Sequence, residues 1–324
     1  MRRRAALLLC LAALAGCETP EPVSAPQSVA RPVQRTPARP AAPPPKVAPE
    51  PPAPSEASRT LATYYARLQN DLLGQGLLRG DGGGADTPFT DRMLAENFLA
   101  VALYDEYVSD GGTLRAQPTQ SRLRRWDQPV RMTVEFGPSV PAEQRARDRT
   151  GVAAYAARLS RASGLPIRVT DADPNFHVLF LSEDDRAGYA DRLRQIVPGI
   201  PSSSLRAITN LPRDQLCIVI AFSQNNSSSY AKAVAVIRAE HPDLLRTTCV
   251  HEELAQGLGL ANDSPQARPS IFNDDEEFGL LTRHDELLLK MLYDPRFTTG
   301  MTLPEATPIA REIAAELVAG TGPS

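Results

Sequence analysis

Residues 242–263 read PDLLRTTCVHEELAQGLGLAND and form the most informative stretch of the chain for its fold. The opening proline and aspartate are a typical helix start, and the helix is expected to end near the last leucine. Side chains four residues apart lie on one helix face, so Glu252 and Gln256 should point the same way. Gly259 then allows the chain to turn, so that Asn262 can come back toward them. The segment predicts a long helix with a cluster of polar side chains at its end.

The residues upstream of this helix alternate between strand-like and helix-like hydrophobic patterns. In residues 130–136, VRMTVEF, every second side chain is apolar, which predicts a half-buried strand. The other expected elements are helices at 58–78, 87–108, 141–163 and 184–196, strands at 166–169, 177–181, 215–222 and 231–238, and a loop at 198–212. Residues 224–229, QNNSSS, are a good hairpin loop between the last two strands. This order predicts an α/β (α+β) fold in which helices pack against a mixed sheet.

The first 17 residues have the layout of a bacterial export signal. Three arginines precede an apolar run at residues 5–15, which is too short to span a bilayer. The run ends LAGC, which resembles the lipobox of bacterial lipoproteins, in which the cysteine is diacylated and becomes the first mature residue. We therefore expect Cys17 to carry the lipid, with a plain signal peptide as the alternative. By resemblance to lipoprotein sorting patterns, Glu18 favours the outer membrane over retention in the inner membrane.

Residues 18–56 form a separate segment rich in proline and alanine. Thirteen of the chain's 30 prolines fall between Cys17 and Ala57. The segment has no apolar periodicity and cannot bury enough surface to offset its chain entropy, so we expect a disordered tether. At about 3.1 Å per residue, an extended polyproline chain of this length reaches on the order of 100 Å. An inert spacer is the expected role, and a ligand for a recognition module is the alternative.

Residues 57–324 are long enough for a single globular domain with a buried core. We expect a helical N-terminal part at 57–126, a core at 127–300, and a C-terminal helix or tail at 301–324. The formal net charge is −3 and the isoelectric point is 5.9. The sequence has no basic stripe with interleaved aromatic residues, so nucleic acid is not an expected partner.

Two cysteines remain after the leader and the lipidation position are set aside. Cys217 lies in a predicted strand, and Cys249 lies in the predicted helix at 242–260. An even pair of cysteines in an exported domain is a candidate disulfide. We expect a bond between them, and two buried thiols are the alternative.

The helix at 242–260 also carries a resemblance to a known superfamily. The pattern EExxQxxGLxND at residues 252–263 resembles the metzincin motif HExxHxxGLxHD, with each histidine replaced by another polar residue. The resemblance assigns Glu252, Gln256 and Asn262 to the metal-ligand positions. It assigns Glu253 to the position of the general base. The register that would begin at His251 fails as an HExxH motif, because position 255 is alanine.

The resemblance extends from about residue 129 to residue 293. The sequence SIFN at 270–273 is similar to the metzincin Met-turn, with Phe272 in place of the methionine, and residues 281–293 look like the closing helix. It implies a metzincin-like mixed sheet with packed helices and a long helix of the active-site type. The chain resembles more closely an uncharacterised family of proteobacterial lipoproteins with a domain of unknown function, through LYDPR at 292–296 and Gly300-Met301.

The replaced histidines change the expected chemistry. A catalytic zinc site usually holds three strong protein ligands and a water, whereas amide oxygen is a weak ligand for zinc. Without tightly held zinc, Glu253 has no acidified water to act on. Glu252, Gln256 and Asn262 are then expected to form a hydrogen-bonded polar cluster. His251 lies about 100° around the helix from Glu252 and is expected at the surface or the edge of the core, with a metal ligand as the alternative.

The expected function is therefore that of a lipid-anchored, periplasm-facing module that binds rather than cleaves. Its expected partners are the membrane, through the anchor, and an envelope protein or cell-wall component. No cofactor is expected. The competing hypothesis is a metal-dependent hydrolase with a divalent cation at an atypical Glu/Gln/Asn site. Glu253 could instead be a buried carboxylate that pairs with an arginine such as Arg268 or Arg283.

Overall fold

The computed structural model describes residues 52–110, 113–224, 227–273 and 275–320. The expected signal peptide, Cys17 and nearly all of the expected tether lie outside these described residues. The first helix, α1, spans Glu56–Gly74 and is capped by Ser55, whose side chain accepts a hydrogen bond from the Ser58 N–H. Serine at this position satisfies one of the free amide groups of the first helical turn.

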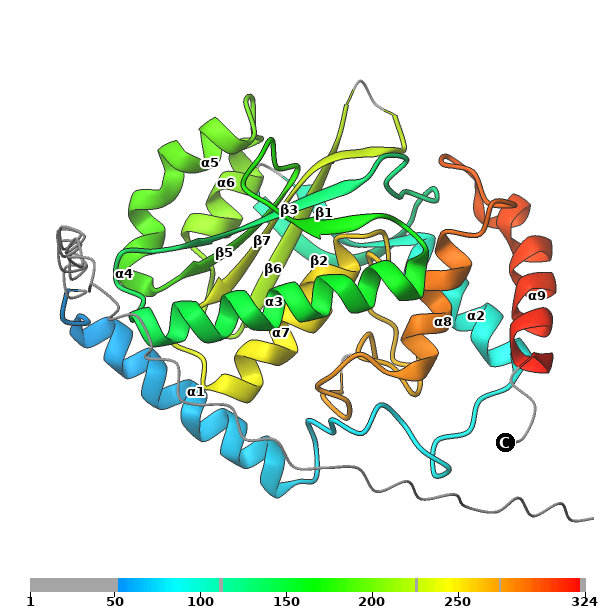
Figure 1. The fold of residues 1–324 in the computed structure, drawn as a ribbon, viewed down its shortest axis with the longest axis horizontal. Helices are drawn as coiled ribbons and strands as arrows, with labels where there is room; N and C mark the ends of the chain where they lie inside the picture. Colours follow the sequence, from blue (N-terminus) through cyan, green and yellow to red (C-terminus); the bar gives the residue numbers. More distant parts are fainter. Residues whose placement is uncertain (1–51, 111–112, 225–226, 274, 321–324) are drawn as a thin grey trace, which may run out of the picture. The chain divides into compact units, whose positions relative to one another are not determined.

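A five-stranded mixed sheet with the order β4-β3-β5-β7-β6 forms the centre of the fold (Figure 1). Its strands are β3 (Val130–Phe136), β4 (Ile167–Val169), β5 (Phe176–Leu181), β6 (Cys217–Ser223) and β7 (Tyr230–Arg238). Strands β3, β4, β5 and β7 are parallel, and β6 pairs antiparallel to β7 at one edge. The predicted strand at 130–136 is present with the same bounds, and the other predicted strands differ by one or two residues at their ends.

Both faces of the sheet are covered, which explains the continuous apolar runs of β5 and β7. Along β7, Ala233, Ala235 and Ile237 face one core, whereas Val234 and Val236 face the other. Successive side chains of a strand point to opposite faces, so each apolar residue of the run is buried. The helices of the first face are α3 (Ala142–Ser163), α7 (Asp243–Gln256) and α8 (Arg283–Leu292), and those of the second are α4 (Glu183–Arg186), α5 (Ala190–Ile196) and α6 (Ser202–Thr209).

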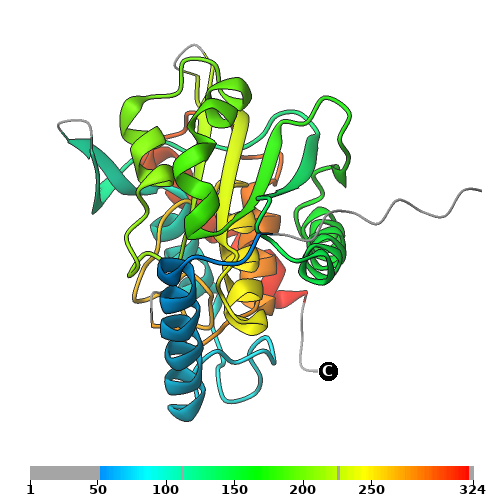
Figure 2. The same cartoon turned by 90° about the vertical axis from the view of Figure 1, so that its left-hand side faces the viewer.

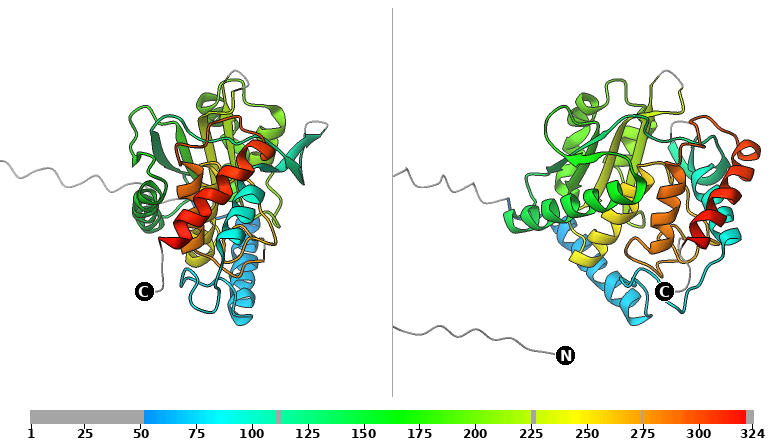
Figure 3. Two further views of the ribbon diagram at one scale, coloured as in Figure 1. Left: turned by 90° about the vertical axis from the view of Figure 1, so that its right-hand side faces the viewer. Right: turned by 45° about the vertical axis from the view of Figure 1, so that its right-hand side comes forward.

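The segment 57–126, expected to be helical, contains a β-hairpin. Helix α2 spans only Asp91–Ala102, and β1 (Tyr104–Asp110) pairs antiparallel with β2 (Thr113–Gln120). The predicted helix at 87–108 was therefore too long. Its last residues include tyrosine and valine, which favour extended structure when a second strand is available for pairing. The hairpin projects from the helices beside it in Figures 2 and 3.

The stretch 198–212, predicted as a loop, contains α6. This short helix buries Ile208 in the second core, and Leu205, one helical turn earlier, packs against the same core. Near the C-terminus, α9 (Leu303–Ala319) packs along α2, as Figures 1 and 3 show, and it provides the expected C-terminal helix. Within the described ranges, no helix is both long enough and apolar enough to cross a bilayer.

Candidate functional site

Helix α7 carries the polar cluster that the sequence singled out, and its C-terminal turn depends on glycine. Gly259 has a φ of +127°, and a Cβ added there would lie 2.3 Å from the Arg124 carbonyl oxygen. Only glycine tolerates both the backbone conformation and this close approach. The neighbouring Gly257 carbonyl accepts a hydrogen bond of 2.9 Å from Trp126 Nε1. The turn after α7 is thereby fixed against the chain that leads into β3.

A cavity of about 160 Å³ lies between the C-terminal half of α7, the edge strand β6 and the hairpin strand β1. We call it the α7 pocket. Its lining residues are Glu106, Tyr107, Asp214, Gln215, Leu216, Cys217, Ile218, Val219, Glu252, Glu253, Gln256, Asp263 and Glu276. Six of these residues are acidic, and none of these lining residues is a lysine, an arginine or a histidine. The α7 pocket is therefore strongly acidic.

Glu253 is the most deeply buried acid of the α7 pocket. Its side chain accepts a hydrogen bond from the backbone N–H of Val219 in β6, and the residue is only 3 % exposed. Its Oε2 atom has no hydrogen-bond partner. Burial, followed by the charges of Glu106 and Asp263, raises the pKa of Glu253 well above its ordinary value. No arginine contributes to its environment, and Arg268 pairs with Glu277 instead.

Glu252 lies beside Glu253 and has a similar environment. Burial is the main cause that raises the pKa of Glu252 well above its ordinary value. The nearby charges that add most to this effect are the carboxylates of Asp263, Glu253, Glu276 and Glu106, in that order. Buried carboxyl groups without a cationic neighbour favour the protonated form. Perturbed acids that line a cavity are typical of functional sites.

The ligand positions of the metzincin pattern do not all meet at the α7 pocket. Gln256 lines it and donates a hydrogen bond of 3.1 Å from Nε2 to Asp263 Oδ1. Asn262 points elsewhere: its Nδ2 donates to the Ala100 carbonyl oxygen, 2.9 Å away in α2. Asp263 reaches the pocket in its place. The carbonyl groups at the end of α2 lack helical partners, and Asn262 satisfies one of them, which explains its orientation.

His251 lies on the other side of α7, against α3. Its ring stacks on that of Tyr155 with a centroid separation of 3.9 Å, and its Nδ1 accepts a hydrogen bond of 3.0 Å from the Leu281 N–H. Burial, with the nearby Arg158 charge, lowers the pKa of His251 to about 3. The imidazole therefore stays neutral and serves packing, as expected for a residue at the edge of the core.

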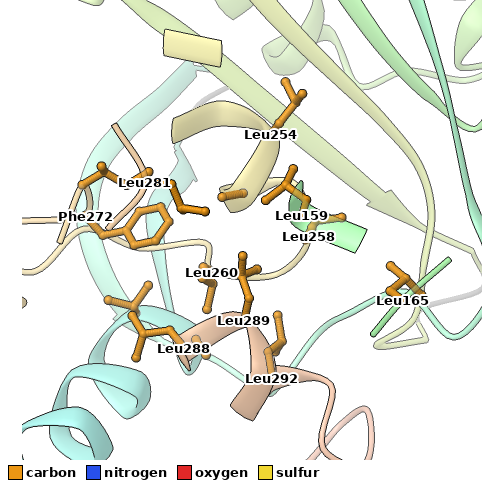
Figure 4. Packing of buried hydrophobic residues seen from close by; sticks show 14 of the residues in the cluster. Leu159, Leu165, Leu254, Leu258, Leu260, Phe272, Leu281, Leu288, Leu289 and Leu292 are labelled. Atoms are coloured by element: carbon orange, nitrogen blue, oxygen red, sulfur yellow. The ribbon is translucent and has the colours of Figure 1, made fainter. Parts of the chain in front are cut away.

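The segment similar to the Met-turn is part of the hydrophobic core. Phe272 is fully buried and lies among Leu260, Leu281 and Leu288 (Figure 4). The nearby Asp285 is also fully buried, and it accepts hydrogen bonds from the Ser270 hydroxyl, the Ile271 N–H and the Thr282 N–H and hydroxyl. Asp285 thus caps the start of α8 and leaves no free carboxylate for chemistry at this position.

A catalytic zinc site does not fit the residues that are present. In the described part of the chain, no group of three or more histidine, cysteine, aspartate or glutamate side chains is placed to hold a metal ion. The α7 pocket offers carboxylate and amide oxygens, whereas zinc prefers imidazole nitrogen and thiolate. No step that requires a zinc-bound water can be assigned to Glu253 from this geometry.

Comparison with known proteins defines the family. A family model described as "Protein of unknown function (DUF2927)" matches residues 91–312. The chain belongs to the DUF2927 family. No curated protein and no solved structure matches the chain. The matched region runs from α2 to α9 and therefore includes the sheet, α7 and every residue that lines the α7 pocket of this DUF2927 domain.

A disulfide links the edge strand of the DUF2927 domain to the helix under it. Cys217 begins β6 and Cys249 lies in α7, and their sulfur atoms are bonded with a Cα–Cα separation of 5.8 Å. Cys217 also lines the α7 pocket. The bond therefore holds together two of the pocket's walls.

A larger cavity of about 430 Å³ lies between α3 and α7, on the side of His251. The buried Arg246 and the half-buried Arg158, which line this cavity, are already paired. Arg246 contacts Asp148 at 2.8 Å, and Arg158 contacts Glu286 at 2.7 Å. The buried Glu253, whose Oε2 has no hydrogen-bond partner, lines the α7 pocket, which is therefore the stronger candidate site.

Sequence reasoning missed one wall of the α7 pocket. Glu106 and Tyr107 come from β1, in a segment that was predicted to be helical, and Glu276 follows the segment similar to the Met-turn. Tyr107 accepts a hydrogen bond of 2.9 Å from Gln215 Nε2, which joins β1 to the start of β6. No motif marks these residues, and only the pairing of β1 with β2 brings them to α7.

Proposed function

We propose that this DUF2927 protein is a lipid-anchored protein of the cell envelope whose domain binds a ligand at the α7 pocket without cleaving it. The carrying observation is the lining of the pocket, which presents the buried Glu253 beside the half-buried Glu252 and no imidazole. Such a site is suited to recognition of a complementary group. It lacks the ligands that would generate a metal-bound nucleophile.

The metzincin-like resemblance supports a common architecture without the common chemistry. The mixed sheet, with α7 beside its edge strand, agrees with the arrangement that the resemblance implies. The three ligand positions carry Glu252, Gln256 and Asn262, and the last of these binds a backbone carbonyl in α2. We therefore propose an inactive, metallopeptidase-like domain that retains its pocket for binding.

The proposed location rests on the N-terminal sequence. Cys17 is the proposed lipid attachment site, and residues 18–56 are the proposed tether that holds the domain away from an outer-membrane surface facing the periplasm. An envelope protein or a cell-wall component is the proposed partner. Substitution Cys17→Ser tests the anchor: incorporation of labelled palmitate and recovery in the membrane fraction should both be lost. Unchanged labelling would place the lipid elsewhere or reject lipidation.

One observation favours the competing hydrolase. The unpartnered Oε2 of Glu253 occupies the position that the metzincin pattern gives to the general base. Metal analysis of the untagged protein, purified without chelators, separates the two hypotheses. We expect less than stoichiometric zinc and no cleavage of a casein substrate. A stoichiometric divalent ion that is lost in Glu252→Ala, together with proteolysis that is lost in Glu253→Gln, would establish the hydrolase.

A further inference from the structure

We infer that the α7 pocket receives a primary ammonium group, carried by a small amine or by a lysine side chain. This inference rests on the proposed binding function and names the chemistry of its ligand. The first argument is the charge balance of the pocket. Six of the thirteen residues that line the pocket are acidic, and none of these thirteen is cationic.

Buried charges in proteins are normally paired, because an isolated one loses its hydration without compensation. Two groups of ion pairs elsewhere in this domain illustrate the rule. Arg246 is only 4 % exposed and pairs with Asp148, and Glu135 contacts both His177 and Arg192. Glu252 and Glu253 have no cationic side chain among the residues that line their pocket, and their raised pKa values favour the protonated, uncharged forms. A cation that enters from outside the chain would favour the ionised carboxylates and pair with them.

The second argument is the orientation of Glu253. One oxygen of its carboxyl group is occupied by the Val219 N–H, whereas Oε2 is buried without a partner in a residue that lines the cavity. A buried acceptor left without a partner costs about 1–3 kcal/mol, and more when the group is charged. Its position against the cavity means that a donor entering from solvent can satisfy it.

The size and donor geometry of the pocket favour an ammonium group over a metal ion. The described residues offer no group of three metal-binding side chains placed for one ion. The cavity volume of about 160 Å³ is also many times the ~10–15 Å³ that a cavity needs to hold one water molecule. An ammonium head has three donors that can reach separate acceptors, whereas guanidinium presents a planar fork suited to one bidentate carboxylate. Separate acids on α7 and its neighbours match the ammonium head.

Isothermal titration calorimetry of the full chain in neutral detergent micelles tests the inference. The probes are cadaverine and the uncharged 1,5-pentanediol, which has the same carbon chain without the ammonium groups. We expect cadaverine to bind with one site per chain and pentanediol to give no heat above dilution. Equal binding of both probes, or binding of neither, would overturn the inference. This comparison uses the parent protein and does not depend on the folding of any variant.

Variants locate the site. Glu252→Gln and Glu253→Gln should each weaken cadaverine binding at least tenfold, whereas Glu143→Gln, at an exposed position on α3, should leave it unchanged. Unchanged affinity in both pocket variants would reject the α7 pocket. Nα-acetyl-lysine methylamide distinguishes the source: tighter binding than cadaverine identifies a polypeptide lysine, and weaker binding identifies a free amine.

The same preparation also separates failure of this inference from failure of the proposed function. Absence of amine binding in metal-free, non-proteolytic protein would overturn only the ammonium ligand. A stoichiometric divalent metal that excludes cadaverine, with proteolytic activity, would overturn both.

Discussion

His251 and Glu253 are two residues apart on α7 and face opposite sides of it. His251 stacks on Tyr155 of α3, whereas Glu253 accepts a hydrogen bond from Val219 of β6. Two residues correspond to about 200° of rotation around an α-helix, so the two side chains cannot meet. The histidine nearest in sequence to the buried glutamates is thus excluded from their pocket, which leaves the carboxyl groups without a nitrogen ligand from α7.

Substitution Glu253→Gln should stabilise the folded domain. Glutamine keeps an oxygen for the Val219 N–H and removes the cost of burying an acid beside Glu106 and Asp263. We expect the free energy of unfolding in urea at pH 8 to rise by about 1 kcal/mol. Glu277→Gln is the control, because Glu277 forms an ion pair with Arg268 and should give no gain. A loss of stability in Glu253→Gln greater than in the control would show that the buried Glu253 carboxyl stabilises the folded domain.

Two glycine-to-alanine substitutions should have opposite effects. Gly259→Ala places a methyl group against the Arg124 carbonyl at a positive φ, and we expect a loss of at least about 2 kcal/mol in unfolding free energy. Gly151→Ala lies within α3 and meets nothing within 4 Å, so it should add up to about 1 kcal/mol through helix propensity. Chemical denaturation of both variants checks this; similar effects at the two positions would show that the turn after α7 is not constrained.

The disulfide should stabilise the folded domain by closing a loop. Cys217 and Cys249 are 32 residues apart, for which the chain-entropy model gives about 3–4 kcal/mol. The double variant Cys217→Ser/Cys249→Ser should lose about this much, measured by urea unfolding. Mass mapping without reduction should show a peptide that joins the two cysteines. Alkylation of both thiols without prior reduction would reject the bond.

His241 should make the domain sensitive to acid. It is 2 % exposed, and burial, with the charges of Arg238 and Arg246, lowers its pKa well below the ordinary value near 6.5. The unfolded chain therefore takes up a proton below pH 6.5 that the folded domain does not. The stabilising effect of the neutral ring is fully present above that pH and is lost as the pH falls, by up to about 1.4 kcal/mol per pH unit.

The variant His241→Phe isolates this contribution. Phenylalanine keeps an aromatic ring beside Tyr65, which His241 contacts edge to face at 4.4 Å between ring centroids. Among the described residues, His241 Nε2 has no hydrogen-bond partner, and the only side-chain contact of the ring nitrogens that the substitution removes is that of Nδ1 with Cys249 Sγ at 3.7 Å. Urea unfolding between pH 7.5 and 5 should show a smaller decrease in stability for the variant than for the parent. Parallel pH profiles would assign the acid sensitivity to other groups.

Local patterns were sufficient for most of the sheet and for α7. Residues 130–136 alternate between apolar and polar side chains, and β5 and β7 are short, continuous apolar runs. Each of these patterns lies within a single strand, so it could be recognised in the sequence without knowledge of the partner strands. The hairpin β1–β2 could not, because its extended conformation depends on pairing between two polar strands. A predicted helix at 87–108 extended into β1 for the same reason.

The candidate site divides in the same way. The sequence by itself determined that Glu252, Glu253 and Gln256 share the end of one helix, because helical spacing fixes their relative directions. Only the tertiary structure decided that Glu106 and Glu276 join them while Asn262 turns to α2. Contacts between distant segments form where buried backbone groups need hydrogen-bond partners and where side chains must fill space. The local pattern of residues along the chain does not show which distant segments will meet in this way.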